Sequence, residues 1–375
     1  MMDLHTDFDN QKAWDDDQSL HDQMELESQL GSETCEDAAD VEACSEAPVK
    51  KEKQLKLWHG ILLLVFVAAD IIFLGSFVSM VLGIRGFYAT AMGEILMLLG
   101  ALAVTLLAGA RLKPVFQFRK PEWKKSFGTV LLWVGCFFLT ILVTTIMEYF
   151  FPTEMAGVSE GLEQGILSVS MLPALLIVSL SPAICEEMVF RGVLFNCIWN
   201  KTHRKWVTII LVGMIFGIFH GSIWRFVPTC ILGIMMGYIL FETNNMFYNM
   251  LFHGINNACP ILLMFASGLT SDGVGSQMDA VLNDPEAYRM TLLPAIGFYM
   301  ILGAMGLILL YLGRNMICHV DLTVPGEIRL AKKTKERNRM VILACALGIL
   351  GLLVIFVGAW LGGGVLAEGT SVVFG

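Results

Sequence analysis

Nine apolar runs, each about as long as a lipid bilayer requires, dominate this sequence of 375 residues. They lie at about 58–83, 89–110, 127–150, 166–199, 206–223, 226–242, 245–266, 293–313 and 340–361. Hydrophobic residues make up 55% of the chain and charged residues only 16%, whereas a soluble domain is about 25% charged. We therefore predict an all-α fold, a polytopic transmembrane helical bundle of about nine spans.

Two stretches do not divide into simple spans. The run at 166–199 is too long for one crossing, so we expect it to include a surface-lying turn before it crosses. The runs at 206–223 and 226–242 are short and only a few residues apart. The segment 267–292 is polar and acidic, which is typical of an exterior loop, and such a loop is placed to cover a site.

Lys and Arg residues between the runs alternate from one side of the membrane to the other. Twenty lie in the segments 50–56, 111–125, 200–205 and 314–339, and three lie in 84–88, 151–165, 222–226 and 267–292. Because cytoplasmic loops carry the excess of basic residues, we predict a cytoplasmic N-terminus. The short connections favour a bacterial plasma membrane.

The N-terminal segment differs from the rest of the chain in charge. Residues 1–47 hold 15 acidic residues and one lysine, so this segment cannot bury enough apolar surface to fold alone. We predict a disordered acidic cytoplasmic tail at 1–49, N-terminal transmembrane helices at 50–164, a central core at 165–266, and an exterior loop with C-terminal transmembrane helices at 267–375. The basic run 331–339 is expected to be a solvated face or an anionic-lipid contact, so no nucleic-acid partner is predicted.

Two glutamates and an arginine stand inside an apolar run, in the stretch S181-P-A-I-C-E-E-M-V-F-R191. An ionisable side chain at membrane depth costs about 2.5–3.5 kcal/mol, so these residues need an explanation. Glu187 and Arg191 are four residues apart and share a helix face, where they can pair. Glu186 lies one step around the helix and stays free to act as a carboxylate. The structural alternative is that the Glu187–Arg191 pair only holds two spans together.

Two later stretches add polar groups at a similar depth. His220 ends the apolar run F216-G-I-F-H220, and H253-G-I-N-N257 places His253 and Asn257 on one helix face. A single intramembrane histidine is usually a packing residue, but three spans that contribute Glu, His, and His plus Asn indicate one common site. Asp70, Glu94 and Glu148 are other acidic residues in or near spans. We interpret Asp70 as a packing hydrogen bond or a helix-end contact.

Together the three stretches resemble the ordered motifs EExxxR, FxxxH and HxxxN/D of the CPBP family (CAAX protease and bacteriocin-processing, or Abi), a family of intramembrane endopeptidases. The resemblance covers about residues 165–265. It implies hydrolysis of a peptide bond in a membrane-associated protein or peptide, without a cofactor. Glu186 would be the general base that activates water, His220 would position that water, and His253 and Asn257 would stabilise the oxyanion. Glu187, Arg191 and Phe216 would be supporting residues.

Other interpretations stay open. Glu186, His220 and His253 supply two imidazoles and a carboxylate, the ligand set of several catalytic zinc sites, so a zinc-dependent protease is an alternative. The same cluster suits a substrate or proton pathway in a transporter, or a non-catalytic immunity protein that kept the fold. The natural substrate, and whether it is prenylated, is not encoded in these motifs.

Overall fold

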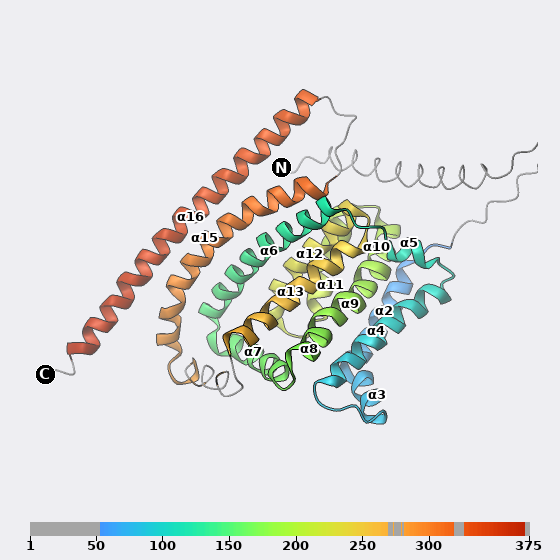
Figure 1. Cartoon of the computed structure of the whole chain (residues 1–375), viewed down its shortest axis with the longest axis horizontal. Coiled ribbons are helices and arrows are strands. Elements are labelled where there is room, and N and C mark those ends of the chain that lie inside the picture. Colours follow the sequence, from blue (N-terminus) through green and yellow to red (C-terminus); the bar gives the residue numbers. More distant parts are fainter. Residues whose placement is uncertain (1–52, 269–272, 274–278, 280, 319–325, 372–375) are drawn as a thin grey trace, which may run out of the picture.

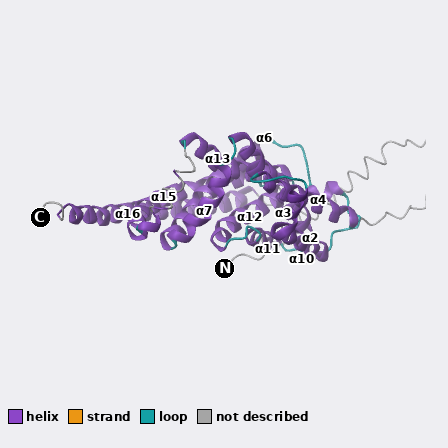
Figure 2. Ribbon diagram, turned by 90° about the horizontal axis from the view of Figure 1, so that it is seen from below, coloured by secondary structure: helices purple, strands orange, loops and turns teal. Residues whose placement is uncertain are grey.

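The structure, a computed structural model, describes residues 53–268, 273, 279, 281–318 and 326–371. Within these ranges the chain forms helices and no strand (Figure 2), which confirms the predicted all-α class. The predicted acidic tail at 1–49 lies outside the described residues, as does much of the predicted exterior loop.

The elements follow one another in a simple order along the chain. They are α2 (Leu57–Ala69), η1 (Asp70–Leu74), α3 (Gly75–Val81), α4 (Tyr88–Leu107), α5 (Leu112–Phe116), α6 (Trp123–Phe150), α7 (Pro152–Leu167), α8 (Met171–Ala174), η2 (Leu175–Leu180), α9 (Ser181–Glu187), η3 (Met188–Leu194), α10 (Phe195–Thr202), α11 (Lys205–Ile218), α12 (Ile223–Thr243), α13 (Met246–Ser267), α15 (Pro285–Ile317) and α16 (Gly326–Ser371). The labels η1 to η3 mark π-helical segments.

Eight helices in the described part of the chain are long and apolar enough to cross a membrane. They correspond to eight of the nine predicted runs, so the chain is an integral membrane protein with a polytopic helical bundle. The remaining run, predicted at 206–223, forms α11, an apolar helix of only 14 residues. It ends early because Gly221 adopts a positive φ of 68°, a backbone conformation that glycine tolerates at a turn.

The run predicted at 166–199 contains the expected turn before it crosses, since α7 ends at Leu167, residues 168–170 are not helical, and one continuous helix follows from Met171 to Thr202. Two boundaries differ from the sequence-based expectation. The predicted exterior segment 151–165 is largely the helix α7, which starts at Pro152, the first helical position where proline is favoured. The last part of the predicted loop 267–292 belongs to α15, because the Asp284 side chain accepts a hydrogen bond from the Ala287 backbone N–H at 2.9 Å and caps that helix early.

The continuous helix from Met171 to Thr202 lies at the centre of the bundle. In the most apolar 18 residues of this helix 44% of the residues are buried, whereas the corresponding share in α16 is 11%. Figure 1 shows α15 and α16 at one edge of the molecule and α2, α3 and α4 at the other. The central helix contacts α4 on one side and α13 on another. Side chains on the facing sides of these helices, such as Glu94, Glu187 and His253, are therefore removed from the bundle surface.

Glycines allow α6 and α15 to pack with their backbones in close contact. A Cβ atom on Gly135 of α6 would lie 2.6 Å from the carbonyl oxygen of Gly306 on α15, and a Cβ on Gly306 would lie 2.8 Å from that of Gly135. The Tyr288 hydroxyl of α15 also donates to Glu148 Oε1 of α6 at 2.5 Å. Small residues at facing positions are a common means of helix association within membranes.

We expect Gly135→Leu to lower the stability of the α6–α15 pair by about 1–3 kcal/mol, the usual cost of forcing extra atoms into a packed contact. The measurement is the thermal midpoint of the purified protein in detergent. Gly161→Ala on α7 is the matched control, since a Cβ there has no atom within 4 Å and alanine favours a helix over glycine by about 0.5–1 kcal/mol. Equal midpoints for both variants would contradict the close backbone contact.

Candidate active site

Glu187 and Arg191 form a fully buried ion pair on the central helix. Arg191 Nη1 lies 3.1 Å from Glu187 Oε1, and both side chains are 0% exposed. The pair expected from the four-residue spacing is therefore present. Burying two charges is costly unless further groups satisfy them, so the other contacts of each side chain matter.

Arg191 is held by two further groups from neighbouring helices. Its Nη2 donates to the backbone carbonyl of Gly233 on α12 at 3.0 Å. Its guanidinium carbon lies 4.4 Å from the ring centroid of Phe216 on α11, a cation–π contact that gains strength away from water. Phe216 therefore contacts the ion pair from α11, and its supporting role stays a prediction.

Glu187 is shared between Arg191 and a histidine from another helix. His253 Nδ1, on α13, lies 2.9 Å from Glu187 Oε1, and the histidine side chain is 5% exposed. An ionised carboxylate only accepts hydrogen bonds, so Nδ1 carries the proton and donates it. The Glu187–Arg191 pair is thus linked to α13 through Glu187. Glu186 leaves the helix in a direction about 100° from that of Glu187.

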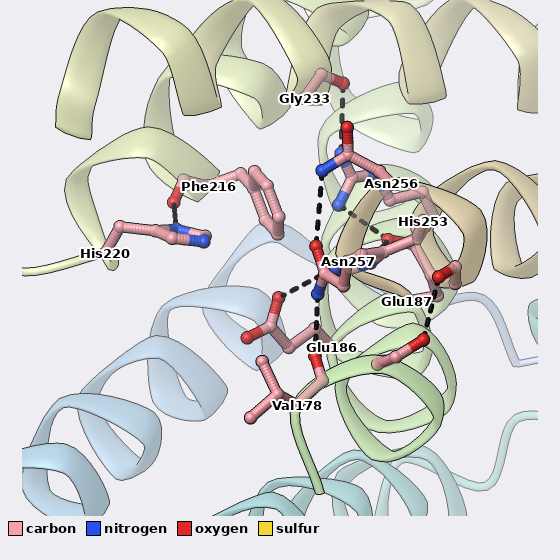
Figure 3. Close-up of polar contacts among 12 residues, drawn as sticks. Val178, Glu186, Glu187, Phe216, His220, Gly233, His253, Asn256 and Asn257 are labelled. Atoms are coloured by element: carbon pink, nitrogen blue, oxygen red, sulfur yellow. Dashed lines mark hydrogen bonds and ion pairs between the residues drawn. The ribbon is translucent and has the colours of Figure 1, made fainter. Parts of the chain in front are cut away.

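Glu186 faces the other nitrogen of the same histidine. Its Oε2 lies 3.8 Å from His253 Nε2, and its side chain is 16% exposed, whereas that of Glu187 is 0% exposed. This separation exceeds a direct hydrogen bond. Among the described residues, Oε2 of Glu186 has no hydrogen-bond partner. The two neighbouring glutamates are therefore distinct, since Glu187 binds both Arg191 and His253, whereas Glu186 faces His253 Nε2 without a direct hydrogen bond (Figure 3).

His220 stands opposite, at the end of α11. Its Nδ1 lies 2.9 Å from the carbonyl oxygen of Phe216, and its ring is 4.7 Å from the Phe216 ring, centroid to centroid. A carbonyl oxygen only accepts, so Nδ1 is the protonated nitrogen, and Nε2 of the neutral ring is left as an acceptor. In Figure 3 the imidazole extends from its own helix end toward the side of the site where Glu186 lies.

Asn257 connects α13 to the central helix. Its Nδ2 donates to the backbone carbonyl of Val178 at 3.0 Å, and its Oδ1 accepts from Asn256 Nδ2 at 3.2 Å. Asn257 lies one turn along α13 from His253, as the four-residue spacing predicted. The structure thus brings Glu186, His220, His253 and Asn257 to one region from the central helix, α11 and α13 (Figure 3).

Two carboxyl groups near this region were left out of the site by the sequence analysis. Asp70, on η1, is 3% exposed, and neither of its carboxyl oxygens has a hydrogen-bond partner within the described ranges. The packing hydrogen bond expected at Asp70 is therefore absent, whereas the helix-end position given as the alternative is present, because Asp70 follows α2 and begins η1. Glu94, on α4, is 7% exposed and lies close enough to Glu186 and Asp70 to interact electrostatically with both. The sequence could have indicated both residues, because each stands inside an apolar run and carboxyl groups within a membrane are seldom without a role.

The alternative zinc site would use Glu186, His220 and His253 as ligands. Among the residues that the structure describes, no group of three or more His, Cys, Asp and Glu side chains is arranged to hold a metal ion. The two imidazoles are anchored through their Nδ1 atoms, His253 to Glu187 and His220 to the Phe216 carbonyl. Histidine ligands of metals are commonly anchored in this way through the nitrogen that does not bind the metal, so zinc stays the alternative to a metal-free site.

Comparison with known proteins identifies the region that holds these side chains. Residues 168–259 match the family model described as Rce1-like, type II CAAX prenyl endopeptidase Rce1-like. This segment, called the Rce1-like segment below, is similar to that family. The match spans the central helix, α11, α12 and most of α13, and it includes all three motifs, which confirms the resemblance to the CAAX protease family. It indicates a membrane protease of the CAAX type. No curated protein and no solved structure matches the chain.

Proposed function

We propose that the Rce1-like segment is an intramembrane endopeptidase in which Glu186 is the general base. The observation that supports this most is the 3.8 Å approach of Glu186 Oε2 to His253 Nε2, with the other histidine nitrogen held by Glu187 at 2.9 Å. A carboxylate and an anchored imidazole that face each other at this separation suit one water molecule between them. His220 Nε2 supplies a further acceptor for that water.

In the first step, water attacks the scissile carbonyl carbon as one of its protons passes to Glu186. The π electrons of the carbonyl move onto its oxygen and give a tetrahedral oxyanion. His253, doubly protonated with Glu187 as its counter-ion, donates from Nε2 to this oxyanion. Asn257 donates with the amide hydrogen that Val178 does not use. Donors placed in advance at a developing charge are among the largest contributions to catalysis.

In the second step, the tetrahedral intermediate collapses and the carbon–nitrogen bond breaks. The proton on Glu186 passes to the leaving nitrogen, which departs as an amine. Glu186 is then a carboxylate again, and the sum of the two steps is the addition of one water across the peptide bond. Two imidazoles, one carboxylate and one amide from this chain perform these steps, so the proposal includes no cofactor.

The proposed substrate is a membrane-associated protein or peptide, because the site lies on bilayer-spanning helices. The name of the matched family includes CAAX prenyl substrates, which makes a lipidated peptide the first candidate. We keep the cytoplasmic N-terminus and the plasma membrane as part of the proposal, since the distribution of basic residues supports the orientation.

The function is tested by incubating the purified protein with a membrane-anchored fluorescent peptide, prenylated or not, with and without a strong chelator. We expect cleavage that the chelator does not reduce, because the proposed steps use only side chains of the chain. Cleavage that stops on chelation and returns with zinc would replace this mechanism by a metalloprotease. Failure to cleave any peptide of either class, by protein that is folded, would overturn the proposal.

A further inference from the structure

Proline at position 182 removes a backbone donor inside the central helix. In an α-helix the N–H of each residue donates to the carbonyl four residues earlier. Pro182 has no N–H, so the carbonyl of Val178 lacks the donor that an α-helix would give it. The helix adapts locally, since residues 175–180 form the π-helical segment η2 and the Ser181 N–H donates to the Leu176 carbonyl, five residues back. Such single π-turns are frequent at functional sites.

The carbonyl left open by Pro182 is the one that Asn257 binds. Asn257 Nδ2 donates to the Val178 oxygen at 3.0 Å. A second contact reinforces this junction, because Ser179 Oγ donates to the Gly254 carbonyl on α13 at 2.7 Å. Both contacts join η2 to the turn of α13 that follows His253. Leaving a backbone carbonyl away from water without a donor costs free energy. The hydrogen bond from the Asn257 amide to the Val178 carbonyl avoids that cost.

We infer that Pro182 is a positioning residue for Asn257: by leaving the Val178 carbonyl without its helical donor, it orients the amide that stabilises the oxyanion. The inference rests on the proposed role of Asn257 in hydrolysis. One amide hydrogen of Asn257 is then held by the backbone of the central helix, and the other is directed by that bond. Without Pro182 the amide loses its preferred partner and samples other rotamers.

Replacing Pro182 by alanine separates this role from a purely structural one. The new N–H at position 182 competes for the Val178 carbonyl and closes an α-helical hydrogen bond. We expect the thermal midpoint of Pro182→Ala to be unchanged or higher, because proline inside a helix is unfavourable. At the same time, kcat should fall about tenfold with KM nearly unchanged, as part of an oxyanion-stabilising interaction is lost. A proline needed only for folding would lower the midpoint and the activity together.

The decisive measurement is a double-mutant cycle between position 182 and Asn257, with kcat for the membrane-anchored peptide as readout. If Pro182 acts through Asn257, Pro182→Ala causes no further loss in an Asn257→Ala background. Pro294→Ala is the matched control, since Pro294 lies inside α15, outside the Rce1-like segment. It should leave kcat unchanged.

Each other outcome has a distinct meaning. If Asn257→Ala lowers kcat while Pro182→Ala does not, or if the two losses multiply, the inference is overturned and the proposed function stands. Wild-type kcat in Asn257→Ala would remove the oxyanion role of Asn257 and the inference with it. Pro182→Gly restores the same N–H and is the second variant, and failure of both substitutions to fold would assign Pro182 to folding and overturn the inference.

Discussion

Glu186→Gln is expected to lower the hydrolysis rate by about 10³-fold, within the 10²–10⁴-fold contribution of a general base. Glutamine keeps the shape of the side chain but cannot take a proton from water. Stability should change little, because Glu186 Oε2 has no hydrogen-bond partner among the described residues. The measurement is single-turnover cleavage of the membrane-anchored peptide, together with the thermal midpoint of each variant.

Two controls sharpen this prediction. Glu286→Gln changes an exposed glutamate that pairs with Arg289 on α15, and it should have the rate of the wild type. Glu187→Gln changes the neighbouring glutamate, and we expect it to lower stability as well as activity, because that carboxylate binds both Arg191 and His253. A Glu186→Gln variant that retains more than about a tenth of the activity would exclude Glu186 as the base.

Arg191→Met is expected to destabilise the fold by about 3–5 kcal/mol, the usual result of leaving one member of a buried ion pair without its partner. Methionine also loses the contact with the Phe216 ring and the hydrogen bond to the Gly233 carbonyl. Glu187 is then left buried with His253 as its remaining partner. Thermal and denaturant unfolding in detergent measure the loss.

The double variant Glu187→Leu with Arg191→Met tests whether the charges serve stability or activity. Replacing a buried ion pair by apolar residues is often neutral or stabilising, so the double variant should be more stable than Arg191→Met. It should nevertheless be inactive in peptide cleavage, because His253 Nδ1 loses the carboxylate that orients it. Recovery of activity along with stability would mean that the Glu187–His253 contact has no part in the reaction.

Some features of this protein are local enough to be predicted from its sequence. The eight spans were found because a helix that crosses the bilayer needs about 20 consecutive apolar residues. Runs of about this length are recognisable in the sequence. The Glu187–Arg191 pair was also predictable, because residues four apart meet on one helix face. By contrast, α7 was missed at 151–165, since Glu154, Glu160 and Glu163 make it too polar to resemble a span.

Which groups meet between helices was decided only by the tertiary structure. The sequence indicates that Glu187 can reach Arg191, but not that His253 from α13 contacts the same carboxylate oxygen, Oε1, at 2.9 Å. In the same way, Pro182 in the sequence means that the Val178 carbonyl lacks its helical donor. That Asn257 donates to this carbonyl depends on how α13 lies against η2. Asp70 and Glu94 became neighbours of the site only when α4 packed against the central helix and η1 packed against α4.

The physical reason for this division is the range of the forces involved. Hydrophobic length, helix periodicity and the loss of a backbone donor at proline act within a few residues of the chain, so the sequence alone determined the spans, the paired face and the three motifs. Contacts between helices depend on rotation and depth, which are set by close packing such as that of Gly135 against Gly306. That packing sums many small contacts from distant parts of the chain, and only the folded bundle turns Glu186 and His253 toward each other.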